Sequence, residues 1–120
     1  IMASELRVNT LKDASGNNSV AVSTVAEGTA KSWHHYDQVA NVLRDNTNVA
    51  SISDTATGRY TVNYTNSFST AFYCVASSTT ALTNQTSSTA TGSADLRTRD
   101  ASQSDTDASL NTGQMTGDLA

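Results

Sequence analysis

The chain of 120 residues contains no proline and one cysteine, and few of its residues are aromatic. A lone Cys74 excludes an internal disulfide. Proline normally helps to protect the edge strands of β-sheets, so its absence suggests that neighbouring subunits cover the edges. Aromatic residues make up only 6% of the chain, which leaves little large apolar surface for a core. We therefore expect a homotrimer, in which contacts between subunits supply the missing buried surface.

Charge is also scarce: 15% of the residues are charged, and the net charge is -4. The seven Lys and Arg residues are scattered, whereas nucleic-acid binding needs a basic stripe, so we expect no nucleic-acid partner. No apolar run approaches the length of a membrane span, and no charged segment followed by an apolar stretch indicates a signal peptide. We expect no membrane insertion and synthesis in a cytoplasm.

The residues that are abundant favour β-structure over disorder, because Thr, Val and Tyr accompany the low charge. Short strands separated by turn signals predict a mostly β fold, a small antiparallel β-sandwich or barrel. The predicted strands are Ser19–Val25, Lys31–Tyr36, Val49–Ser53, Arg59–Tyr64, Phe72–Ala76, Ala94–Thr98, Ala108–Leu110 and Gln114–Thr116. Residues 37–45 leave a helical turn and a strand with a bend open, because Val39, Val42 and Leu43 fall at i, i+3 and i+4. The Ser/Thr-rich residues 77–93 leave a loop, an exposed strand and a partly disordered tip open.

One hairpin is the clearest local prediction. The segment from Asp54 to Gly58 is expected to be its turn, with Gly58 at a backbone position that needs a positive φ. The second strand places Tyr60, Val62 and Tyr64 on one face. The apolar run from Phe72 to Val75 is predicted to be an interior strand. Residues expected in the core or at a subunit interface are Trp33, Tyr60, Val62, Tyr64, Phe72, Tyr73 and Val75.

Residues 1–28 are expected to be an N-terminal arm, and residues 29–120 a β-rich domain that projects from it. Leu6, Val8 and Leu11 are the early apolar positions of the arm, followed by turn-forming residues 13–18. This alternation suffices for one added strand but not for independent folding. We expect the arm to pair with a neighbouring subunit or with another protein.

No residue pattern indicates catalysis, a metal site or a cofactor. His34 and His35 point to opposite faces of a strand, which favours polar surface residues, although a site shared by three chains stays open. Cys74 is predicted to be a small buried hydrophobe. A glycosidase pair is not expected, because the candidate aspartates lie in no recognisable motif and fall mostly where this residue serves turns. These candidates are Asp37, Asp45, Asp54, Asp95, Asp100, Asp105 and Asp107. Sugar stacking is an alternative role for the aromatic residues Trp33, Tyr36, Tyr60, Tyr64 and Tyr73.

The order of these segments resembles a small family of virion proteins of tailed phages, described as tail-fibre or fibre-like structural proteins. The resemblance rests on the strand Ala30-Lys31-Ser32-Trp33, on the hairpin from Asn48 to Tyr64, and on Ala71–Val75. The residues 2–11 and 117–120 also look like the two ends of that family, whereas residues 77–112 match only in being rich in Ser and Thr.

The resemblance implies a non-enzymatic phage virion protein, made in the host cytoplasm. Its arm would attach to other virion proteins of the tail or capsid, and its domain would contact the host surface, including a host-surface glycan. The alternative is a capsid decoration or cement protein, because the chain is short for a fibre. The third reading is a carbohydrate-binding module.

Overall fold

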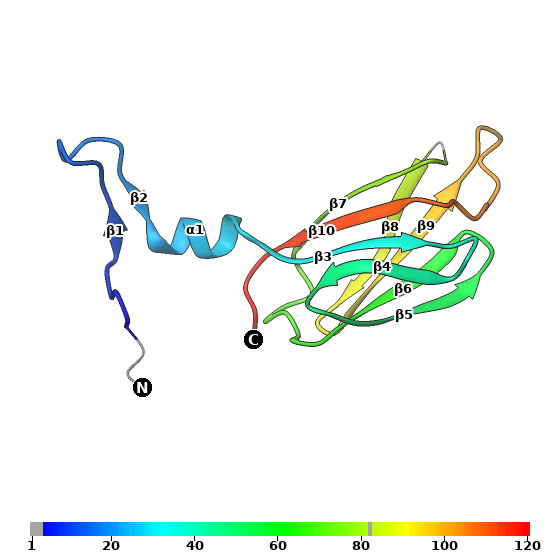
Figure 1. Ribbon diagram of the computed structural model, residues 1–120, viewed down its shortest axis with the longest axis horizontal. Coiled ribbons are helices and arrows are strands. Elements are labelled where there is room, and N and C mark those ends of the chain that lie inside the picture. Colours follow the sequence, from blue (N-terminus) through cyan, green and yellow to red (C-terminus); the bar gives the residue numbers. More distant parts are fainter. Residues whose placement is uncertain (1–3, 82) are drawn as a thin grey trace.

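The computed structural model describes residues 4–81 and 83–120 as an antiparallel β-sandwich preceded by an extended segment (Figure 1). One sheet, here the β3 sheet, has the order β4(Val42–Thr47)-β3(Ala30–Asp37)-β10(Asn111–Thr116)-β7(Cys74–Thr79). The other, the β6 sheet, has the order β5(Val49–Ala56)-β6(Arg59–Tyr64)-β9(Ser93–Arg99)-β8(Thr83–Ala90). The mostly β, antiparallel prediction is confirmed, and the sandwich is the form that the chain adopts.

Two sharp turns carry the chain through the first half of the sandwich. Residues 38–41 form the bend between β3 and β4, so of the two open alternatives the strand with a bend is the one that forms. Asn48 then has a left-handed φ of 58° and takes the chain from the β3 sheet into the β6 sheet. Its side chain exchanges two hydrogen bonds with the backbone of Asn66, at 3.0 and 2.7 Å, which anchor this corner.

The β5–β6 hairpin has a shorter turn than the sequence indicated. Gly58 has a φ of 68°, so its left-handed conformation is confirmed. Asp54, however, lies within β5 and pairs with Tyr60, and the turn consists of Thr57 and Gly58 alone. The extra residue is absorbed by a register shift between Asp54 and Ala56, which lets the strand run on to a two-residue connection.

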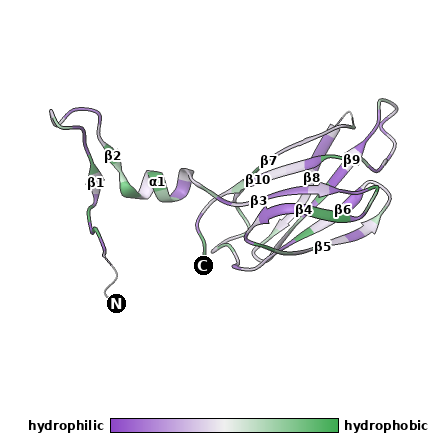
Figure 2. Cartoon of the chain, viewed as in Figure 1, coloured by the Kyte–Doolittle hydropathy of each residue, from purple (hydrophilic) through white to green (hydrophobic). Residues whose placement is uncertain are grey.

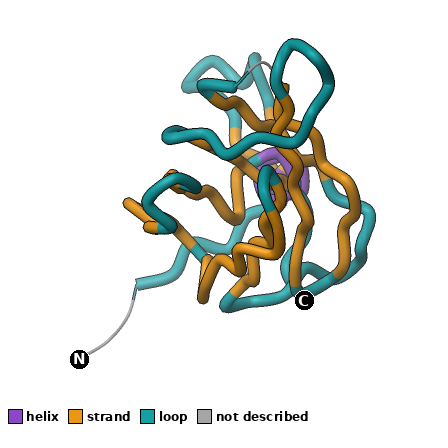
Figure 3. The backbone as a smooth tube through the Cα atoms, turned by 90° about the vertical axis from the view of Figure 1, so that its right-hand side faces the viewer, coloured by secondary structure: helices purple, strands orange, loops and turns teal. Residues whose placement is uncertain are grey.

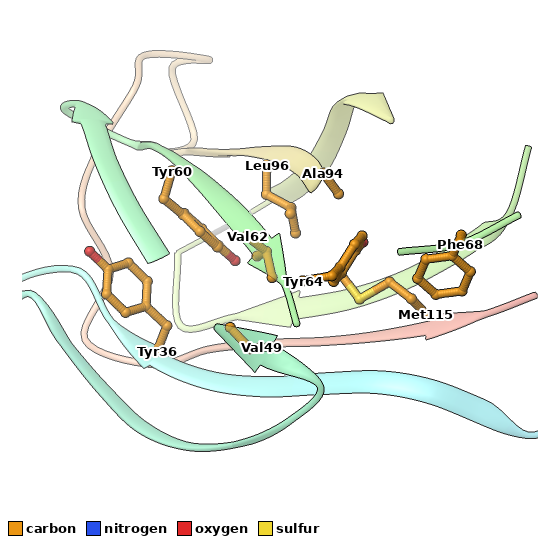
Figure 4. Close-up of a cluster of buried hydrophobic side chains, with 9 residues drawn as sticks. All are labelled: Tyr36, Val49, Tyr60, Val62, Tyr64, Phe68, Ala94, Leu96 and Met115. Carbon is orange, nitrogen blue, oxygen red and sulfur yellow. The ribbon is translucent and has the colours of Figure 1, made fainter. Parts of the chain in front are cut away.

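The core lies between the two sheets (Figure 4). Tyr60, Val62 and Tyr64 are buried as predicted, and Tyr73 and Val75 pack against the core while partly exposed. Aromatic rings pack against one another at one end of the core. The Phe68 ring stacks on Tyr73 at 4.2 Å between centroids and meets Tyr64 edge-on at 5.0 Å. Tyr36, considered above for sugar stacking, is also buried in the core. The core residues that the sequence did not indicate are Val49, Phe68, Ala94, Leu96 and Met115.

Trp33 and Phe72 are not part of the core, contrary to the prediction that included them. Trp33 is 38% exposed and Phe72 is 94% exposed. On β3 the inward positions are Ser32, His34 and Tyr36, so strand alternation turns Trp33 outward. The alternative that these two residues lie at a subunit interface stays a prediction.

The strand around Cys74 is an edge strand of the β3 sheet, so its interior placement was also wrong. Val75, Ser77 and Thr79 face inward and are partly buried, whereas Cys74 is exposed. Further along, β7 and β8 give the Ser/Thr-rich segment regular structure, and β9 contains the predicted Ala94–Thr98. Ala108–Leu110 is not a strand, because β10 begins at Asn111.

A buried amide network fixes the loops at the end of the sandwich away from the N-terminal segment, the end that Figure 3 shows face-on. The Gln38 side-chain oxygen accepts hydrogen bonds from Thr98 Oγ1 at 2.9 Å and from Asn111 Nδ2 at 3.0 Å. It also accepts from the backbone N–H of Ala108 at 3.1 Å. These contacts satisfy groups that burial would otherwise leave unpaired, and they join residues from both sheets.

Before the sandwich, residues 4–28 form β1(Thr10–Leu11), β2(Val20–Ala21) and α1(Val22–Gly28). None of them is buried, and α1 lies between the β1–β2 pair and β3 (Figure 1). The predicted strand Ser19–Val25 is confirmed only over Val20–Ala21, which form β2, and was wrong from Val22, where the chain turns helical. Val22, Val25 and Ala26 have the i, i+3, i+4 spacing of one helical face, a pattern that competes with strand alternation in a run this short.

Candidate binding face

One candidate binding surface is the outer face of the β3 sheet around Trp33. Strand register places Trp33 beside Gln114 of β10, and Gln114 beside Ala76 of β7. The next row contains His35, Thr112 and Ser78. The hydroxyl groups of Ser78 and Thr112 are hydrogen-bonded at 2.7 Å, so this row is partly fixed.

These two rows line a shallow hollow with a volume of about 520 Å³. His34, Ser77 and Gly113 complete its lining. No Lys, Arg, Asp or Glu lines it, so the hollow offers one aromatic ring with hydroxyl, amide and imidazole groups. This composition suits a ligand that has an apolar face and uncharged polar edges.

We expect Trp33→Ala to leave the sandwich folded and to cost less than about 1 kcal/mol of unfolding free energy, because the side chain lies outside the core. The loss of unfolding free energy would be much larger if the indole were buried, as the sequence predicted. The intrinsic fluorescence of the chain, which has a single Trp, should be that of a solvent-exposed indole. A loss of several kcal/mol on substitution would place Trp33 in a packed core instead.

His34 lies under this face and is only 1% exposed, so its prediction as a surface residue was wrong. Its Nε2 is 3.2 Å from the Tyr60 hydroxyl, and its ring packs against Gly113 of β10. A side chain at Gly113 would overlap the imidazole, with an added Cβ 2.3 Å from Cε1. The glycine therefore makes the room that the buried ring occupies.

Burial, together with the nearby His35, lowers the pKa of His34 from 6.5 to about 4. The unfolded chain therefore takes up this proton at higher pH than the folded protein does. The neutral, buried His34 makes its full contribution to the free energy of unfolding above pH 6.5. This contribution falls between pH 6.5 and 4, by about 3 kcal/mol. Denaturant titrations at pH 7 and pH 4.5 should show the loss.

The matched control for the pH effect is His34→Gln, which keeps a polar group near Tyr60 but cannot titrate. Asp37 and Asp105, whose pKa values are lowered by hydrogen bonding, add an acid-dependent loss to both proteins. The difference between the two pH profiles isolates the histidine. Identical profiles would contradict a neutral buried His34.

The aspartates considered for catalysis have structural partners. Asp105 accepts from Arg97 at 2.5 Å and from Arg59 at 3.2 Å, which holds its pKa below the usual value. Asp107 accepts from the Gly58 N–H at 2.7 Å, and Asp100 from the Ser102 N–H at 2.9 Å. The remaining candidates, Asp37, Asp45, Asp54 and Asp95, lie in strands.

Within residues 4–81 and 83–120, no group of three His, Cys, Asp or Glu side chains could hold a metal ion. Among the same residues, no helix is long and apolar enough to cross a membrane. That the protein has no catalytic activity stays a prediction, based on the lack of a catalytic residue pattern in the sequence.

The other predicted site residues are not brought to the binding face. Leu6, Val8 and Leu11 are exposed by 80%, 39% and 44% and belong to the segment before the sandwich. Figure 2 shows further apolar positions on β2 and α1, outside the sandwich. Sequence reasoning missed Gln114, Thr112 and Ser78 as neighbours of Trp33, because only the strand order β3-β10-β7 places them together.

Comparison of the chain with protein-family models, with curated proteins and with solved structures finds no match. The resemblance to phage virion proteins therefore stays a prediction from the residues. The structure offers two surfaces for function, the exposed N-terminal segment and the outer face of the β3 sheet.

Proposed function

We propose that this protein is a non-enzymatic structural protein of a tailed-phage virion, similar to a tail fibre. In this proposal residues 1–28 attach it to another virion protein, and residues 29–120 project as the sandwich domain. It is made in the host cytoplasm and incorporated into the particle there.

The observation that carries the proposal is the contrast between the two parts of the chain. Residues 4–28 bury no side chain, whereas the sandwich has a continuous core of its own. Leu6 is 80% exposed and Val25 is 43% exposed, so the segment offers apolar surface that its own chain does not cover. A segment of this kind is typical of one that becomes ordered against a partner.

The same reasoning supports a homotrimer. The core contains nine buried apolar residues and the chain has no disulfide, so the buried surface of one chain is small. The edge strands β4, β7, β5 and β8 contain no proline, and Phe72 is 94% exposed next to β7. Light scattering should give about three times 12.6 kDa, and a folded monomer at micromolar concentration would contradict the trimer.

A capsid decoration protein is the second candidate, and the size of the chain favours it. The longest dimension is 54 Å with the N-terminal segment included, which is short for a fibre that must attach and also reach a host. In this alternative a trimer would clamp neighbouring shell proteins at three-fold positions.

The experiment that separates the two candidates is quantitative mass spectrometry of purified virions. A tail-fibre protein should be present in tens of copies or fewer per particle, and a capsid decoration protein in hundreds. Absence of the chain from washed particles would overturn both candidates.

A further inference from the structure

We propose that the hollow around Trp33 is a binding site for an uncharged saccharide. This proposal rests on the proposed function in one respect: it names the class of ligand that the projecting domain would bind. It assigns the outer face of the β3 sheet to a ligand, in place of the subunit contact that the sequence analysis considered for Trp33.

The first step is the chemistry of the lining. A pyranose ring has an apolar face of C–H groups and a rim of hydroxyl groups. The exposed part of the Trp33 indole matches the former, and Gln114, Thr112 and Ser78 supply donors and acceptors for the latter. The volume of about 520 Å³ lies within the range of small-molecule sites.

The second step is charge, which decides between ligands that stack on an aromatic ring. A nucleic-acid base could also stack on Trp33, but such sites combine stacking with a positive groove that follows the phosphates. No Lys or Arg lines this hollow, and the net charge of the chain is -4. An acidic sugar would likewise lack a cationic partner here, so the geometry favours a neutral one.

The third step is size, which argues against a second copy of the chain. The hollow is lined by nine residues, whereas a protein interface of standard size uses about 20–30 residues on each side. Phe72 is the large exposed side chain near β7, and it does not line the hollow. A subunit contact through Phe72 would therefore involve a side chain that is not part of the Trp33 site.

The fourth step is rigidity. Trp33, Gln114 and Thr112 lie on two central, adjacent strands of the sheet, and Thr112 is held by Ser78. Below them, the buried His34 ring packs against Gly113 and Tyr60 and supports both strands from inside. A site placed on such strands loses little conformational entropy when a ligand binds.

The test uses the single Trp of the full chain as its reporter. Neutral trisaccharides of glucose, galactose, mannose and N-acetylglucosamine are titrated to millimolar concentration, with trigalacturonate as the acidic counterpart. We expect a saturable change in Trp33 emission with at least one neutral trisaccharide and none with trigalacturonate. No change with any neutral trisaccharide would overturn the proposal, as would binding of trigalacturonate alone.

Three variants locate the site by calorimetry with the trisaccharide that binds. Trp33→Ala should weaken binding at least tenfold, and Gln114→Ala about tenfold, equivalent to one hydrogen bond of about 1.4 kcal/mol. Phe72→Ala, an exposed aromatic residue outside the hollow, should bind as the parent does. Unchanged affinity in Trp33→Ala, or emission of a buried indole in the free assembled protein, would overturn the assignment.

These results are separable from the proposed function. A chain that is present in virions but binds no trisaccharide loses only the saccharide site. A chain that binds a trisaccharide through Trp33 but is absent from virions loses only the proposed role in the particle.

Discussion

Gly58→Ala should destabilise the sandwich by about 3 kcal/mol. The residue has a φ of 68°, and an added Cβ would lie 2.6 Å from both the Thr106 backbone nitrogen and the Thr98 carbonyl oxygen. Left-handed strain costs about 1–2 kcal/mol, and overlap with backbone atoms, which cannot rotate away, adds a similar amount. Chemical denaturation followed by circular dichroism measures the effect.

Gly92→Ala is the matched control, because its nearest contact would be the Ser67 hydroxyl at an ordinary 3.6 Å and its φ is not positive. It should change the unfolding free energy by no more than about 0.5 kcal/mol. Equal stability of the two variants would show that the β5–β6 turn does not pack under the loop that contains Thr106.

Tyr60→Ala should cost about 4 kcal/mol, the largest effect expected of a side chain truncated in the core. Tyr60 is 1% exposed, and its ring lies 5.0 Å from that of Tyr36 and 5.7 Å from that of His34, between centroids. Its truncation leaves a cavity and also removes the hydroxyl group near His34 Nε2. Thermal and denaturant unfolding of the variant provide the measurement.

Phe72→Ala is the contrasting variant, since the sequence analysis grouped both aromatic residues together. At protein concentrations at which the chain is monomeric, its loss should stay within about 0.5 kcal/mol, because Phe72 is 94% exposed. A loss that appears only at high concentration would locate a subunit contact at Phe72. A loss comparable to that of Tyr60→Ala in the monomer would contradict the core described here.

The residues predicted correctly are those in which local pattern and tertiary environment agree. Alternation along Arg59–Tyr64 identifies its buried face, because Tyr60, Val62 and Tyr64 are all apolar and the intervening residues are polar. The glycine of the turn is also readable from sequence, because few other residues adopt a positive φ at low cost.

The binding face could not be predicted in the same way, because β3 is polar or aromatic on both sides. The inward face of β3 contains Ser32 and His34. The room for the buried histidine comes from its packing against Gly113 and Tyr60, which are distant in sequence. Burial of Trp33 was expected because the chain has few large apolar residues to fill a core. Gln114 and Thr112 come from positions about 80 residues after Trp33, and Ser78 from about 45 residues after it, so their placement beside Trp33 depends on sheet topology.

The helix α1 was missed for a different reason. It buries no residue and has no side-chain cap at its N-terminus, so only the short apolar spacing of Val22, Val25 and Ala26 marks it in the sequence. A helix of seven residues is marginal in isolation. Its surroundings in the assembled protein would therefore decide its stability, which is consistent with a segment that docks on a partner.

The most direct test of the central claim is the incorporation of an arm-deleted chain into virions. A chain that lacks residues 1–28 should retain the circular dichroism and cooperative unfolding of the sandwich, because none of the described arm residues is buried. Trp33→Ala, altered only on the projecting domain, is the matched control and should be incorporated as the parent is. The account predicts that quantitative mass spectrometry of purified particles finds the control at full occupancy and the arm-deleted chain absent. Equal occupancy of the two would contradict attachment through the arm and would place the attachment surface on the sandwich.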